Sequence, residues 1–97
     1  MFARVSTFQY QRGALDELVK LFNESIIPAN RARSGHLRTY FLVDAAAEQA
    51  MVISVWESQE ALAAGDHDGF YQAQLGKVQH LLASGVARHI YELKAQS

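Results

Sequence analysis

The segment Ala50–Trp56, AMVISVW, is the feature that most constrains the fold, because it is apolar at every position except Ser54. A short run with several β-branched residues predicts a β-strand. A half-solvated strand would alternate apolar and polar residues more cleanly, so this near-continuous run predicts a strand that is covered on both faces. The fold therefore needs cover on two sides of a sheet.

The rest of the chain alternates between strand and helix patterns. β-forming residues predict three further strands, over Ala3–Tyr10, His36–Val43 and Ala87–Leu93. Apolar residues at helical spacing predict a helix from Ala14 to about Arg33, in which Pro28 should cause a kink or start a short second piece. Ser58 can cap a short helix that ends near Ala64. A second long helix carries the apolar stripe Tyr71, Leu75, Val78 and Leu82.

The resulting order, β-α-β-β-α-β, is that of the ferredoxin-like α+β fold, with an antiparallel sheet and both helices on one face. A length of 97 residues predicts a single domain over 1–97. If Met51, Ile53 and Val55 point away from the helices, a monomer would expose a broad apolar patch, which soluble monomers rarely do. We therefore predict a two-fold homodimer.

Composition excludes several classes of function. The formal net charge is −1 and there is no run of lysine or arginine, which argues against nucleic acid and anionic membranes as partners. The absence of cysteine excludes disulfides, thiolate nucleophiles and thiolate metal sites. No apolar run approaches the roughly 18 residues of a membrane span, and the N-terminus lacks a signal-peptide layout. We expect a soluble, cytoplasmic protein.

Short motifs give the chain a family resemblance. Trp-Glu-Ser ends a strand at Trp56–Ser58, Glu-Ala-Leu follows at Glu60–Leu62, and an aromatic pair stands at Phe70–Tyr71. A helix that bears Pro28 runs towards Gly35 before the second strand. Over almost its whole length, the chain resembles the antibiotic biosynthesis monooxygenase family. The resemblance implies a dimeric α+β barrel, in agreement with the dimer predicted from the apolar strand.

The resemblance also implies candidate functions. The family includes cofactor-independent monooxygenases of quinols and polyketide-derived phenols, and also haem-degrading enzymes. The haem-degrading pattern has an asparagine on the first strand and a histidine on the late helix; here Ser6 or Thr7 and Gln74 stand near those positions, so haem degradation is not expected. The leading hypothesis is a monooxygenase of a quinol or phenolic substrate that uses no cofactor. The alternatives are a non-catalytic dimer that binds a small aromatic ligand and a purely structural dimer.

In the family resembled, the strand face that carries Trp56 looks towards the helices. Trp56 could fill the core there, or line a pocket in which its ring stacks on a flat ligand. We predict a cavity between sheet and helices, mostly apolar with a few polar groups. Its predicted lining residues are Phe22, Ile26, Val52, Ser54, Trp56, Tyr71 and Gln74. Gln74 should need a polar partner there.

His67 is the candidate proton acceptor, because histidine titrates near neutral pH and its neighbours are carboxylates. Capping of a helix is the simpler role for those neighbours, Asp66 and Asp68. Consecutive side chains do not converge on a metal ion without a remote ligand, so no metal site is predicted. Arg33 falls on the core side of the first helix if that helix continues, where it could meet an anionic ligand group.

Overall fold

The computed structural model describes all residues from Met1 to Ser97 and contains one four-stranded sheet. Its strands are β1 (Phe2–Gln9), β2 (His36–Asp44), β3 (Gln49–Trp56) and β4 (Ala87–Glu92), in the order β2-β3-β1-β4. Every neighbouring pair is antiparallel. The predicted ferredoxin-like α+β fold is confirmed.

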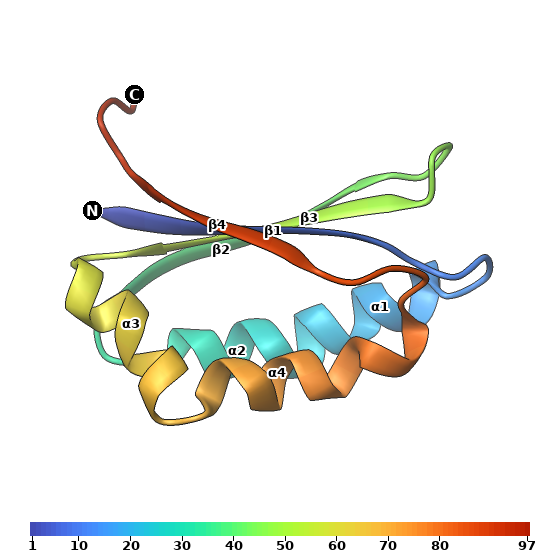
Figure 1. Ribbon diagram of the computed structural model, residues 1–97, viewed down its shortest axis with the longest axis horizontal. Coiled ribbons are helices and arrows are strands. Elements are labelled where there is room, and N and C mark those ends of the chain that lie inside the picture. Colours follow the sequence, from blue (N-terminus) through green and yellow to red (C-terminus); the bar gives the residue numbers. More distant parts are fainter.

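All the helices lie on the same side of this sheet (Figure 1). They are α1 (Leu15–Leu21), α2 (Ile27–Arg31), α3 (Gln59–His67) and α4 (Phe70–Val78), and a 3₁₀ turn over Gln79–Leu81 follows α4. None of them combines the length and apolar character that a membrane crossing requires. The short helix after Ser58 is present, but it continues to His67 and does not end near Ala64.

The predicted irregularity at Pro28 takes the form of a π-helical turn over Phe22–Ile26, between α1 and α2. The Ile27 amide donates to the Phe22 carbonyl, five residues back, which widens the helix immediately before the proline. Pro28 has no amide hydrogen, and its ring would clash with a carbonyl in a regular α-helix. The wide turn removes that conflict, so the helix continues to Arg31 without a break.

The core lies between the sheet and the helices. Leu18 of α1 is completely buried, and Leu62 of α3 is nearly so. Phe22 stacks on Phe41 of β2, with ring centroids 4.1 Å apart and an interplanar angle of 7°. Phe8 of β1 is buried in the same cluster. Aromatic and aliphatic side chains therefore fix the helical layer on the sheet.

The loop before β2 is held against the start of α3. Ser58 caps α3, accepting a hydrogen bond from the Ala61 amide at 3.1 Å. Gly35 has φ +83°, and a Cβ there would lie 2.5 Å from the Cβ of Ala61. Both the left-handed backbone and the close approach require glycine. This contact places the loop beside Trp56, the last residue of β3.

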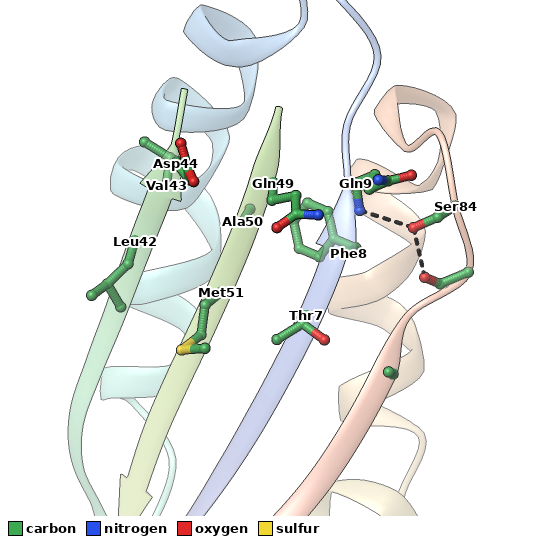
Figure 2. Close-up of a pocket in the computed structure, with 12 residues that line it drawn as sticks. Thr7, Phe8, Gln9, Leu42, Val43, Asp44, Gln49, Ala50, Met51 and Ser84 are labelled. Atoms are coloured by element: carbon green, nitrogen blue, oxygen red, sulfur yellow. Dashed lines mark hydrogen bonds between the residues drawn. The ribbon is translucent and has the colours of Figure 1, made fainter. Parts of the chain in front are cut away.

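The other face of the sheet carries no helix (Figure 1). Thr7, Met51 and Leu42 occupy adjacent positions across three strands, and Figure 2 shows their side chains close together. Tyr40 and Tyr91 are half exposed or more. As predicted, Met51 points away from the helices, with a shallow depression of about 680 Å³ beside it. The chain thus covers only one of the two sheet faces, although its apolar strand is suited to cover on both.

Trp56 lies on the helix-covered face and is only 4% exposed, so its substitution tests how that face is packed. Trp56→Ala should lower the free energy of unfolding by about 3–5 kcal/mol, because a large buried ring leaves a cavity when truncated. Urea denaturation measures the loss. Trp56→Phe should cost less, since most of the buried area remains. A loss below about 1 kcal/mol for Trp56→Ala would show that the ring is not packed as described.

Candidate functional site

A small cavity lies between the sheet and the helices. Six of the seven predicted pocket residues line it: Phe22, Ile26, Val52, Ser54, Tyr71 and Gln74. The helical side chains come from the π turn and α4, and the strand side chains come from β3. With Phe8 of β1, the cavity has three aromatic rings, aliphatic walls and several polar groups in one place, an arrangement that is usual for small-molecule pockets.

Trp56, the seventh predicted residue, does not line the cavity. Its indole Nε1 donates to the Ser54 hydroxyl at 3.1 Å, and Ser54 is a wall residue. The edge of the His36 ring packs against the indole, with ring centroids 5.2 Å apart. Trp56 therefore supports the cavity from behind, through Ser54.

His67 also lies outside the lining residues, as the exposed last residue of α3. Its acidic neighbours bind arginines. Asp66 accepts from Arg4 and from Arg88, each at 2.9 Å. No three His, Cys, Asp or Glu side chains are arranged to hold a metal ion.

Asp68 and Arg33 form an ion pair at 2.6 Å. The hydrogen bond from Arg33 lowers the pKa of the Asp68 carboxyl, and a second hydrogen bond from the Phe70 amide lowers it further. The guanidinium of Arg33 also lies over the Phe70 ring, 4.3 Å from its centroid. Arg33 is therefore directed at α4 and not at the cavity.

Sequence reasoning missed three polar wall residues, Arg4, Ser6 and Asn30, each of them buried. Arg4 and Ser6 alternate with the outward residues of β1, on the same face as the buried Phe8. Asn30 follows Ile26 by four residues, and its amide donates to Thr39 at 3.2 Å. The spacing could have identified them, because each is a polar residue that falls on the same face of its strand or helix as buried neighbours.

Several polar groups of the wall have side-chain hydrogen-bond partners. The Ser6 and Tyr71 hydroxyl oxygens are 3.3 Å apart. The Gln74 carbonyl oxygen accepts from the Lys77 ammonium at 2.7 Å, so Gln74 has the partner that we expected it to need, supplied by its own helix. These contacts hold hydroxyl and amide groups at fixed places on the cavity wall.

The cavity has a volume of about 70 Å³. That space holds a few water molecules, and it is smaller than the cavity of about 150 Å³ that takes up a single benzene ring. An aromatic ligand enters only if wall side chains move. Tyr71, Gln74 and Leu75 are half buried and follow one another on α4, so they can move with the least loss of packing.

A family model described as antibiotic biosynthesis monooxygenase matches residues 1–80. The chain belongs to the antibiotic biosynthesis monooxygenase family. The family match supports a general monooxygenase-type function. A search of curated proteins gives no match to the chain.

Three solved structures illustrate the family fold. A monooxygenase from the ActVA-Orf6 gene of Streptomyces coelicolor, in complex with nanaomycin D, has TM-score 0.81 and 18% identity over 99% of this chain and 89% of its own. SnoaB of Streptomyces nogalater, a cofactor-independent oxygenase studied as a point mutant, has TM-score 0.80 and 14% identity over 98% and 94%. A variant of MhuD with two manganese protoporphyrin IX molecules per active site has TM-score 0.79 and 24% identity over 100% and 98%.

His36, which packs on Trp56, makes folding depend on pH. Burial lowers the pKa of its imidazole below the ordinary value of 6.5. The unfolded chain therefore binds the proton more readily, so the contribution is present above about pH 6.5 and is lost as the pH falls through the folded pKa. The free energy of unfolding, measured by urea at several pH values between about 7.5 and 5.5, should fall more steeply for the wild type than for His36→Gln. Equal slopes for wild type and His36→Gln would contradict this role.

Proposed function

We propose that this chain is a monooxygenase that oxidises a small phenol or quinol without metal, flavin or haem. The observation that supports this most directly is the mixed character of the cavity, which combines the aromatic walls Phe8 and Phe22 with the ionisable groups Arg4 and Tyr71. A purely apolar cavity would have favoured a non-catalytic binding protein. A completely filled interior would have favoured a structural dimer.

The proposed reaction balances without an external reductant. A phenol and one O₂ give a quinone and one water. One oxygen atom becomes the new ring carbonyl, and the other leaves as water with the phenolic hydrogen and the hydrogen of the attacked ring carbon. The four electrons come from the aromatic substrate itself. The protein has to bind and orient the ring, exclude water and help to remove the phenolic proton.

The wall residues would divide these tasks. Phe22, Ile26 and Val52 would hold the ring, and Ser54 and Gln74 would orient its oxygen substituents. Tyr71 lies on the polar part of the wall, because the guanidinium groups of Arg4 and Arg88 lie over its ring while its hydroxyl meets Ser6. At about 70 Å³ the cavity is smaller than a single benzene ring requires, so even a one-ring substrate would need the wall side chains of α4 to move.

For the proton acceptor we retain His67 as a proposal. Its exposed side chain lies outside the cavity lining, so the proton would have to reach it through water. It is next to Asp66, which binds the wall residue Arg4. His67→Gln should then lower kcat more than it changes KM.

The uncovered sheet face supports a homodimer as the working form of the protein. Leu42, Met51 and Tyr40 are exposed by 46%, 37% and 50%, and they lie on adjacent strands. A second copy packed sheet against sheet would bury this apolar surface. The same contact would supply the cover that the strand Ala50–Trp56 requires on its second face.

Oxygen uptake by metal-stripped protein, with a panel of hydroquinones and naphthols, tests the proposed reaction. At least one compound should be oxidised, and the same compound should change the Trp56 emission, because Trp56 contacts the wall residue Ser54. Val52→Phe should block the cavity and abolish uptake, while the same change at the exposed Val19 should leave it intact. Ligand binding without any oxygen uptake would support the non-catalytic alternative. No response in either measurement would overturn the proposal.

Light scattering after size-exclusion chromatography tests the dimer. The wild type should have about twice the chain mass of 10.8 kDa at micromolar concentration. Tyr40→Glu should produce monomers, because it places a charge in the centre of the contact, whereas Val19→Glu on α1 should not. A monomer mass for the wild type would refute the proposal.

A further inference from the structure

The inference concerns Arg4, a charged side chain in the middle of the sheet. Arg4 is only 6% exposed although it lies on β1, a central strand, and it lines the cavity. Its Nη2 donates to Asp66 at 2.9 Å and, at 3.4 Å, to the Leu62 carbonyl. Its Nε is the one buried side-chain nitrogen or oxygen atom of the chain without a hydrogen-bond partner. Buried donors of this kind are rare in folded proteins and call for an explanation.

The charges around Arg4 do not cancel. Asp66 binds both Arg4 and Arg88, so two guanidinium groups share one carboxylate. The same two guanidiniums lie over the ring of Tyr71, 4.3 and 4.6 Å from its centroid. The groups that face Arg4 are thus Asp66 of α3, Tyr71 of α4 and Arg88 of β4. With the tyrosine neutral, this cluster carries one excess positive charge at the cavity wall.

Burial lowers the pKa of the Arg4 guanidinium, and Asp66 opposes that effect. The guanidinium still holds its proton at neutral pH, because arginine does not lose it in proteins. A positive group with a free N–H, in a site with little water, binds an anion more strongly than the same group on the surface.

We infer that Arg4 recognises an anionic oxygen on the ring of the ligand, so that the cavity binds a phenol as its phenolate. This rests on the proposed function for the presence of an aromatic ring in the cavity. Of the guanidinium nitrogens, only Nε is both fully buried and unpaired, and a phenolate satisfies it with one oxygen, without burying a second charged oxygen as a carboxylate would. The hydroxyls of Ser6 and Tyr71 line the same cavity and can donate to the same oxygen. The only bond broken is the phenolic O–H; its electron pair stays on oxygen and the proton leaves to solvent or a base.

Two probes of nearly the same size separate charge from shape. 4-Nitrophenol at about pH 8.5 is mainly the phenolate, and its visible absorption reports ionisation, whereas 4-nitroanisole cannot ionise. Equilibrium dialysis gives Kd for each. The wild type should bind the phenolate about tenfold or more tightly than the ether, as expected of a charge-assisted hydrogen bond in a dry site. 4-Nitrobenzoate, a third arm, should bind less tightly than the phenolate.

The matched variants are Arg4→Gln and Arg88→Gln. Both remove one positive charge beside Asp66 and Tyr71, but only Arg4 lines the cavity. Arg4→Gln should remove the preference for the phenolate while leaving Kd for the ether within about twofold; Arg88→Gln should retain the preference. If Arg4→Gln fails to fold, the double variant Arg4→Gln, Asp66→Asn, which also removes the carboxylate that pairs with Arg4, gives the same test.

Each outcome decides the question. Equal affinity of the wild type for phenolate and ether overturns the inference, as does an Arg4 variant that weakens both probes by the same factor. Tighter binding of 4-nitrobenzoate replaces the phenolate with a carboxylate and also overturns it. Absence of any binding overturns both the inference and the aromatic pocket. Preferential binding of the phenolate without oxygen uptake by any phenol supports the inference while the proposed function fails.

Discussion

The structure depends on a mismatch between the sheet and the helices that cover it. Four strands present two faces, and the helices pack against only one of them. The central strand β3 is apolar on both sides, so the fold leaves exposed what its sequence prepares for burial. The covered face contains the core and the cavity. The residues of β3 that alternate with the cavity wall lie on the uncovered face. They are apolar and not charged, as residues of a face prepared for burial are.

On the covered face, the buried Arg4 connects elements that are far apart in the sequence. Its guanidinium reaches Asp66 and the carbonyl of Leu62 from β1, and thereby fixes α3 against the sheet. Arg88 of β4 binds the other oxygen of Asp66. This network also explains the length of α3: the helix continues past Ala64 because Gly65 packs against Phe70 and Asp66 has two partners. The ion pairs of Asp66 with Arg4 and Arg88 thus belong both to the polar side of the cavity and to the last turn of α3.

Much of the fold and part of the site could be read from the sequence. Strand β3 followed from its near-continuous apolar run, its two faces followed from the period of two of a strand, and the stripe that contains Phe22 and Ile26 followed from the helical period. Trp56 was assigned to the correct face, but it stands at the end of β3, where Ser54 separates it from the cavity. A single sequence does not show how far along a strand a cavity extends.

Arg4 was missed for a different physical reason. A charged residue near the end of a chain is expected in solvent, and only the pairing of β1 between β3 and β4 shows that its strand is central. Asn30 was missed because the kink or second helical piece predicted at Pro28 leaves open which way the side chains after it point. The position of His67 depends on where α3 ends, and element ends are the least certain part of any reading of a sequence.

The π turn before Pro28 makes the form of the first helix part of the site. Across this turn the chain uses one more residue than an α-helix would, and Asn30 comes after it. If the same residues formed a regular α-helix, everything downstream would be rotated by about 100°. Asn30 would then leave the cavity wall although no wall residue had been substituted. A change in the turn between Phe22 and Pro28 would therefore present a different side chain to the ligand at this point, so the helical form of this turn is a route to new specificity.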